Sequence, residues 1–243
     1  MTIPEGLLTA LRDSRRICVL TGSGISAESG VPTFREAQTG LWEQYDPHQL
    51  ATPDAFQRDP ELVWRWYRWR RDLVAAVAPN AGHHALVTLA GLLPELTLVT
   101  QNVDGLHQRA GSDGVIEFHG NLFEDRCFDE GCVVTDADMS AVVPVCPDCG
   151  GMLRPGVVWF GESIPESAMH DAAAAVSSCD LFFSIGTSAL VWPAAGLAEA
   201  ARQQGAAVVE INLDATPLSL QSDFRLQGKS GLILPELIDC LAL

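Results

Sequence analysis

The sequence predicts an α/β fold, a doubly wound parallel sheet that carries a small inserted metal-binding module. Short apolar runs typical of buried strands alternate with segments of helical periodicity, and repeated alternation of this kind gives a parallel sheet covered by helices. Four cysteines form two pairs between residues 127 and 149 and interrupt this alternation. With 243 residues and a hydrophobic content of 47%, the chain is long enough for one large domain with a smaller insertion.

The elements of the large domain follow from local patterns. Strands are predicted at 17–20, 96–99, 115–118, 157–160, 181–185 and 207–211, and helices at 5–14, 60–77, 81–92 and around 106–107. Asn80 is expected to cap the helix at 81–92. Residues 36–53 are rich in turn formers and aromatics, so we expect a long loop there that could act as a lid.

The glycine-rich stretch TGSGISAESGVPTFR, residues 21–35, follows the first strand. Gly22 and Gly24 can take positive φ and, without a Cβ, let backbone N–H groups approach a ligand. A short helix beginning near Ser26 would favour a phosphate at its N-terminus, and Phe34 and Arg35 add an aromatic face and a cation. We interpret the stretch as a pyrophosphate cradle. A structural turn is the alternative, because the spacing G-x-G-x5-G differs from the dinucleotide fingerprint G-x-G-x-x-G.

Small polar residues follow the later strands of the predicted sheet. Because parallel strands end at one edge of a sheet, and ligands bind there, we expect these residues to lie together. They are Gln101, Asn102 and Asp104 after the second strand, and Gly186, Thr187, Ser188, Asn212 and Asp214 after two later ones.

His119 ends a predicted strand beside Gly120, where the sheet edge would present ligands, and a histidine can act as a general base near neutral pH. A lone histidine is more often structural, and that interpretation is kept for His48, His83, His84 and His170. His107 is expected to support packing and hydrogen bonding.

The cysteines of the insertion follow the pattern Cys127-x4-Cys132-x13-Cys146-x2-Cys149, which is typical of a zinc ribbon. Four thiolates would close a tetrahedral site, so the zinc would be structural. Four unligated thiols and an Fe–S cluster are the alternatives. An odd total of seven cysteines favours a reducing compartment over disulfides, and Cys18, Cys179 and Cys240 are expected in the core.

The net charge of −16 argues against a nucleic-acid or anionic-membrane surface. The amino-terminal residues do not resemble a secretory signal, and no stretch approaches the roughly 18 apolar residues of a membrane span. We therefore expect a cytoplasmic protein that acts as a monomer, without nucleic-acid or membrane partners.

Tyr67 and Arg70 lie three residues apart in the predicted helix at 60–77, hence on one face. A phenol and a guanidinium so placed can bind one carboxylate. The alternative is a basic solvated face, because other arginines occur in the same stretch.

Three stretches resemble the sirtuins, a family of NAD-dependent protein-lysine deacylases: the glycine-rich stretch, TQNVDGLHQRAG at 100–111 and EFHG at 117–120. The resemblance covers nearly the whole chain, with Ser23 in place of the usual alanine and Gly156 in place of a frequent histidine. It implies a Rossmann-like NAD-binding domain over 1–119 and 156–243, a zinc module over 120–155 and a helical lid region at about 36–78.

The resemblance also implies roles for individual residues. NAD would be bound by Gly22, Ser23, Gly24, Ser26, Phe34, Arg35, Gln101, Asn102, Asp104, Gly186, Thr187, Ser188, Asn212, Leu213, Asp214 and Ser230. His119 and Asn102 would be catalytic, with His119 taking a proton from a ribose hydroxyl after the acyl oxygen has displaced nicotinamide. The products would be a free lysine, nicotinamide and acyl-ADP-ribose.

The substrate would be an acyl-lysine protein or peptide, bound extended along Val158, Trp159 and Phe160 by strand addition. Tyr67, Arg70 and the small Ala51 resemble the acyl pocket of the bacterial desuccinylase and demalonylase subgroup (class III), which implies a preference for acidic acyl groups. A mono-ADP-ribosyltransferase and a non-catalytic sensor of NAD or ADP-ribose are the alternatives.

Overall fold

A computed structural model describes residues 3–32, 46 and 50–241 of the chain. Six parallel strands form its main sheet in the order β3-β2-β1-β6-β7-β8. This is the doubly wound order, which confirms the predicted fold class. The strands are β1 (Arg16–Thr21), β2 (Glu95–Thr100), β3 (Ile116–Glu117), β6 (Leu181–Ile185), β7 (Ala207–Asn212) and β8 (Phe224–Gln227).

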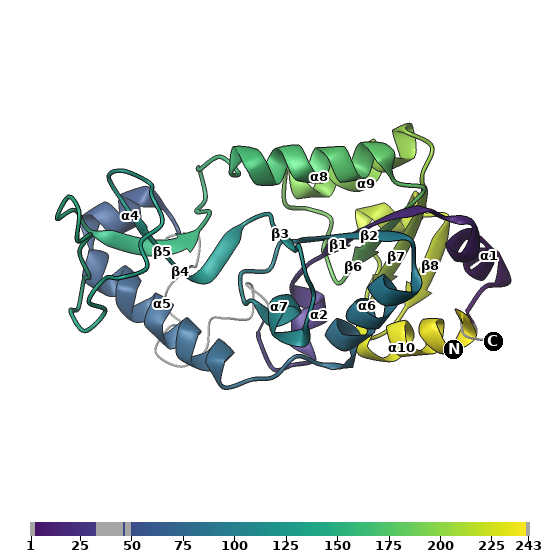
Figure 1. Ribbon diagram of the computed structural model, residues 1–243, viewed down its shortest axis with the longest axis horizontal. Helices are drawn as coiled ribbons and strands as arrows, with labels where there is room; N and C mark the ends of the chain where they lie inside the picture. The colour runs from purple at the N-terminus through teal and green to yellow at the C-terminus, as the bar shows by residue number, and fades with distance from the viewer. Residues whose placement is uncertain (1–2, 33–45, 47–49, 242–243) are drawn as a thin grey trace.

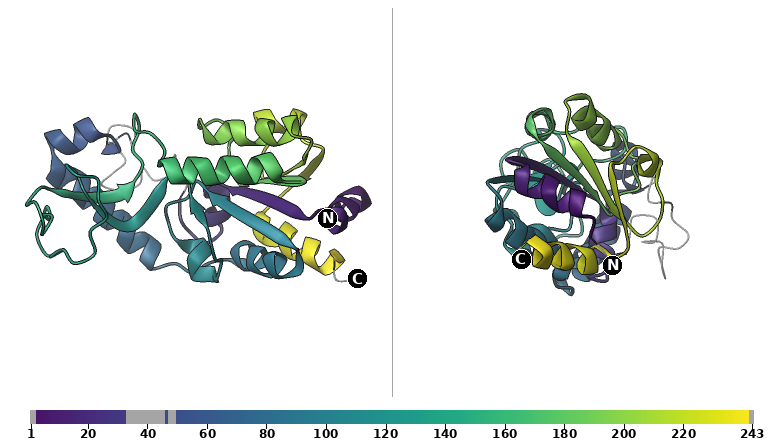
Figure 2. Two further views of the ribbon diagram at one scale, coloured as in Figure 1. Left: turned by 45° about the horizontal axis from the view of Figure 1, so that its top comes forward. Right: turned by 90° about the vertical axis from the view of Figure 1, so that its right-hand side faces the viewer.

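Helices cover both faces of this sheet (Figures 1 and 2). On one face lie α8 (Glu166–Ser178), the 3-10 helix η2 (Ala194–Gly196) and α9 (Leu197–Gln203). On the other lie α2 (Ser23–Ala27), α6 (Ala81–Leu92), α7 (Leu106–Ala110) and α10 (Ser230–Leu241), with α1 (Glu5–Asp13) at the end where both termini lie. A second 3-10 helix, η3, covers Pro217–Leu220.

Alternation along β1 shows why both faces are covered. Ile17 and Val19 join the core beneath α6 and α10, whereas Cys18 and Leu20 join the core beneath α8 and α9. Such a strand is buried on both sides, so it forms a continuous apolar run. As predicted, Cys18 and Cys179 are buried in the core beneath α8 and α9. Cys240 packs against the other core, beneath α6 and α10.

A smaller lobe extends from one end of the sheet (Figure 1). It combines an antiparallel pair, β4 (Gly120–Cys127) and β5 (Leu153–Val157), with two helices, α4 (Pro53–Arg58) and α5 (Pro60–Ala75). Their buried side chains form one core, in which Phe56, Trp64 and Trp66 pack with residues of the cysteine-bearing segment. The insertion therefore shares its apolar core with a distant part of the chain.

Several elements differ from the predictions. The helix after β1 begins at Ser23 rather than near Ser26, and Gly22 is its N-cap. The strand predicted at 157–160 ends at Val157, because the next backbone donors bond to loops: Val158 N donates to His119 O and Phe160 N to Ala51 O. Helix α4 and strand β8 were not predicted. No helix in the described part of the chain is both long and apolar enough to cross a membrane.

Candidate functional site

The loops after β1 and β6 meet at the carboxyl edge of the sheet, where the strand order reverses. A Cβ on Gly24 would lie 2.7 Å from the Gly186 Cα, and a Cβ on Gly22 would lie 2.8 Å from the Gly186 oxygen. Neither Gly22 nor Gly24 uses the positive φ that is open to a glycine, whereas Gly186 does, at +61°. The first two glycines are needed for close backbone approach, and Gly186 for both approach and conformation.

Polar side chains from three strands converge on these loops, as predicted. Gln101 Nε2 donates to the side-chain oxygen Oγ1 of Thr187 at 3.0 Å, and Asn212 Nδ2 donates to the backbone oxygen of Thr187 at 2.8 Å. Asn102 Nδ2 donates to the Gly22 oxygen at 3.0 Å. Ser188 is half-buried beside them, and Leu213 and Asp214 are exposed after β7. The hydrogen bonds therefore hold the ends of β1, β2, β6 and β7 in one arrangement.

A buried hydrogen-bond relay lies behind this edge. The Asn80 N–H donates to His83 Nδ1, so the proton of this ring is on Nε2, which lies 3.4 Å from Ser26 Oγ. Asn102 Nδ2 donates to the same Ser26 oxygen at 3.1 Å. With two donors on its oxygen, Ser26 keeps its own proton for a third group, and this hydroxyl offsets part of the rise that burial causes in the pKa of Asp104. The relay orients Asn102, and sequence reasoning missed the part of His83, whose only local signal is the capping spacing from Asn80.

His107 extends the buried polar layer. Its Nε2 lies 2.9 Å from Thr21 Oγ1, and its ring meets that of His83 edge-on at 4.8 Å. Burial lowers the pKa of His107 to about 3 and that of His83 to about 4, so both rings are neutral at pH 7. Among the described residues, His107 Nδ1 has no hydrogen-bond partner. The expected packing role of His107 is confirmed.

His119 is half-buried at the end of β3, next to this layer. Its Nδ1 lies 3.1 Å from the backbone oxygen of Gln101. Because a carbonyl oxygen only accepts, Nδ1 carries the proton and Nε2 keeps a lone pair. Burial lowers the pKa of His119, and the bond to Gln101 offsets part of that effect. The ring is therefore a neutral base with its acceptor at Nε2.

The segment after β5 connects His119 to the smaller lobe. Val158 N donates to His119 O and Phe160 N to Ala51 O, both at 2.9 Å. Ala51 is buried, and the Phe160 side chain is 40% exposed. The structure thus places two predicted substrate residues, Val158 and Phe160, between the lobes.

Tyr67 and Arg70 lie behind that segment. Tyr67 is 1% exposed, and its hydroxyl accepts a hydrogen bond from Trp159 Nε1 at 2.8 Å. The Arg70 guanidinium lies over the rings of Trp66 and Tyr67, 5.1 and 5.7 Å from their centroids. Burial raises the pKa of Tyr67, and the positive charge of Arg70 offsets part of that increase. This pair is packed within the smaller lobe and is not a solvated face.

Ser230 is buried at the start of α10, where its Oγ donates to Glu28 at 3.1 Å. The Gly231 N–H donates to the same carboxylate oxygen at 2.9 Å. Glu28 therefore ties the loop after β1 to α10. Phe34, Arg35 and His48, and most of the predicted lid loop, lie outside the described residues.

The four cysteines of the insertion come together in the smaller lobe. The sulfur atoms of Cys127, Cys132 and Cys146 lie within 4.8 Å of one another, and Cys149 Sγ lies 3.5 Å from Cys127 Sγ. A tetrahedral zinc with bonds of about 2.3 Å needs sulfur separations of about 3.8 Å, so the cluster fits zinc. Two similar turns build it, in which Gly131 N donates to Cys127 O and Gly150 N to Cys146 O. Both glycines have positive φ.

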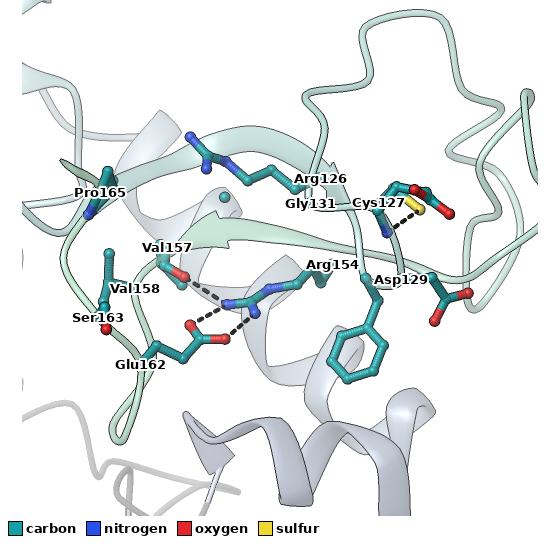
Figure 3. A pocket seen from close by; sticks show the side chains of 14 residues that line it. Arg126, Cys127, Asp129, Gly131, Arg154, Val157, Val158, Glu162, Ser163 and Pro165 are labelled. Atoms are coloured by element: carbon teal, nitrogen blue, oxygen red, sulfur yellow. Dashed lines mark hydrogen bonds and ion pairs between the residues drawn. The ribbon is translucent and has the colours of Figure 1, made fainter. Parts of the chain in front are cut away.

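A cavity of about 450 Å³ opens beside β4 and β5 (Figure 3). Arg154 crosses it and donates to both carboxylate oxygens of Glu162 and to Val157 O. Arg154 and Glu162, two of the charged residues that line this cavity, are thus paired with each other.

Comparisons with known proteins agree with this arrangement. The profile of the Sir2 family matches residues 22–193. An NAD-dependent protein deacylase from Methylococcus capsulatus is 46% identical and aligns over 99% of this chain and 98% of its own. NAD-dependent protein deacylase 1 from Pseudomonas aeruginosa is 48% identical over 96% of this chain and 97% of its own.

Two solved structures are similar over nearly the full length. A crystal structure of a Sir2 homologue in complex with NAD has a TM-score of 0.91 and 43% identity, and covers 99% of this chain and 94% of its own. A Sir2 protein bound to an acetylated peptide has a TM-score of 0.85 and 31% identity, with 98% of each chain covered.

Proposed function

Because this chain belongs to the Sir2 family, we propose that it removes succinyl and malonyl groups from protein lysines in preference to acetyl groups. That it is an NAD-dependent protein deacylase follows from its family and from relatives of that activity over nearly its full length. The choice of acyl group is the further step.

The observation that supports this preference is the pairing of Tyr67 and Arg70 within the smaller lobe. A carboxylate moved out of water without a partner is strongly disfavoured. A guanidinium with a phenol beside it provides charge-assisted hydrogen bonds worth about 1.5–3 kcal/mol, or roughly a tenfold to hundredfold preference. Ala51 leaves room for the longer acyl chain.

NAD is consumed as a co-substrate and supplies the ADP-ribose that accepts the acyl group. The glycine contacts of the cradle fit this ligand, since the backbone there has no side chain to block an approaching pyrophosphate. We assign the pyrophosphate to Gly22, Ser23, Gly24, Ser26, Gly186, Thr187 and Ser188. The nicotinamide side is assigned to Gln101, Asn102 and Asp104, and the adenosine side to Asn212, Leu213, Asp214 and Ser230. We assign to Phe34 the shielding of the reactive ribose carbon and to Arg35 a cation for the cradle.

His119 acts as the general base at Nε2, because its Nδ1 proton is engaged by Gln101 O. Its pKa, lowered by burial, keeps the ring neutral and able to accept a proton at pH 7. Asn102, held by the Gly22 oxygen and Ser26, orients the reacting groups beside it. These residues supply proton transfer and orientation.

The substrate peptide lies extended between the two lobes, along Val158, Trp159 and Phe160. The N–H groups of these three residues already donate within the protein, so strand addition there would use the backbone carbonyls of the segment. Backbone pairing of this kind accepts many sequences around the acyl-lysine. We propose that residues 120–155 form the zinc module and that residues 1–119 and 156–243 form the NAD-binding domain, with a lid region at about 36–78. A four-thiolate zinc has no open position, so its role is structural.

The test compares acetyl-, malonyl-, succinyl- and long-acyl-lysine peptides with NAD, with products measured by mass. Arg70→Met should lower kcat/KM for the succinyl peptide at least tenfold relative to the acetyl peptide. Arg65→Met is the matched control, because Arg65 is an exposed arginine of the same helix. Equal losses for both peptides in Arg70→Met would remove the basis of the preference. ADP-ribose retained on protein would indicate the transferase instead.

A further inference from the structure

The side chain of Trp159 makes a contact that backbone pairing with a substrate peptide would not require. Its indole Nε1–H donates to the Tyr67 hydroxyl at 2.8 Å, across 92 residues of sequence. Both side chains are almost fully buried, with exposed fractions of 2% and 1%. The contact therefore has little competition from water, and it acts on one of the two groups proposed to read the acyl carboxylate.

The Tyr67 hydroxyl accepts a hydrogen bond and carries one proton. Trp159 Nε1 donates to it, and the Arg70 guanidinium lies over the Tyr67 ring, 5.7 Å from its centroid. An indole N–H and a guanidinium can only donate, so neither can accept the phenolic proton. That proton must then point away from these two groups. The hydroxyl is prepared to donate to a third group.

An ionised carboxylate is an acceptor without protons, so it matches a hydroxyl held in the donor role. The methyl end of an acetyl group offers no acceptor at that position. A hydroxyl that could turn freely would lose part of this match, because ordering it would reduce the gain on binding. The direction of the Tyr67 proton is therefore a source of selectivity separate from the charge of Arg70.

Trp159 is itself held in place from several sides. The Arg154 guanidinium stacks 3.4 Å from the centroid of the Trp159 ring, and Glu162 Oε2 accepts from the Trp159 backbone N–H at 2.8 Å. Arg154 and Glu162 are joined to each other, as Figure 3 shows. Phe56 packs against the ring, with centroids 5.4 Å apart. These contacts fix the direction of the indole N–H.

We infer that Trp159 is a positioning residue for acyl selectivity, whose indole N–H holds the Tyr67 hydroxyl as a donor to the substrate carboxylate. The inference rests on the proposed function, since it explains a preference for acidic acyl groups.

The test is a double-mutant cycle of Trp159→Phe and Tyr67→Phe. The measured quantity is the ratio of kcat/KM for succinyl- and acetyl-lysine peptides. Trp159→Phe should lower this ratio about fivefold, the usual size of one hydrogen bond. In the Tyr67→Phe background it should lower the ratio no further, because the acceptor is already gone.

A second variant separates the proton donor from the ring shape. Replacing Trp159 by 3-benzothienylalanine, which has sulfur in place of the N–H, should lower the ratio as Trp159→Phe does. Trp64→Phe is the control: Trp64 is a buried tryptophan of α5 whose Nε1 donates to Leu153 O, so the ratio should not change.

Two outcomes would overturn the inference alone: an unchanged ratio in both Trp159 variants, or an equal fall with and without the Tyr67 hydroxyl. An unsubstituted enzyme with no preference for the succinyl peptide would overturn the proposed function, and this inference with it.

Discussion

The Nδ1 atom of His119 lies 3.1 Å from the backbone oxygen of Gln101, and this one contact assigns the ring's free lone pair to Nε2. The Gln101 side chain also donates a hydrogen bond to Thr187. Gln101 therefore links His119, the proposed base, to the loops that form the glycine cradle.

The first expectation concerns pH. Burial lowers the pKa of His119 below 6.5, and a base must be unprotonated to work. In single-turnover assays the acid limb of deacylation should therefore have its midpoint below pH 6.5. A limb centred above pH 7 would contradict the assignment.

His119→Ala should reduce single-turnover deacylation by about two to four orders of magnitude while NAD binding, measured by calorimetry, remains. His170→Ala, at an exposed histidine of α8, is the control and should retain activity. Near-normal turnover in His119→Ala would show that the base lies elsewhere.

The glycine cradle can be tested by adding one methyl group. The Cβ in Gly24→Ala would lie 2.7 Å from the Gly186 Cα and oxygen, so the loops must separate. We expect KM for NAD to rise about tenfold or more, with a smaller change in kcat. Gly91→Ala is the control, because nothing lies within 4 Å of its Cβ and alanine favours the helix. A normal KM in Gly24→Ala would mean that the close approach has no part in NAD binding.

The cysteine cluster should hold one equivalent of zinc. Cys146→Ser should lose the metal and lower Tm by about 10 °C or more, since binding energy of the metal is folding energy. Cys240→Ser, in α10 and outside the cluster, should keep both. Metal analysis and thermal unfolding measure the two effects. Fully stable protein without metal would end the assignment.

The buried pair His83 and His107 should make the fold sensitive to acid. Both pKa values are lowered, to about 4 and about 3, from an unfolded value of 6.5. Between pH 6.5 and these values only the unfolded state binds the proton, so stability rises with pH in that window. Each ring contributes a slope of about 1.4 kcal/mol per pH unit.

Urea unfolding between pH 5 and 6 tests this slope. His107→Gln should reduce it by about one proton. An unaltered slope in His107→Gln would show that this ring is protonated in the folded protein.

Much of the architecture was predictable because its signals are local. The apolar run at 181–185 is β6, and the helix at 81–92 begins at its Asn80 cap as expected. The cysteine spacing predicted a cluster that the fold brings together. Strand β8 was missed because its sequence FRLQ has no apolar run, and only pairing with β7 makes it a strand.

The sequence by itself determined the alternation of apolar strands and helices around the central strands, the cysteine cluster and the polar residues that follow the strands, because neighbouring residues encode periodicity and spacing. Only the tertiary structure decided that His119 presents Nε2, that Gly24 touches Gly186, and that Trp159 orients Tyr67. These are contacts between distant segments, and they depend on how the lobes pack and which atoms become buried. No local pattern in the chain carries that information.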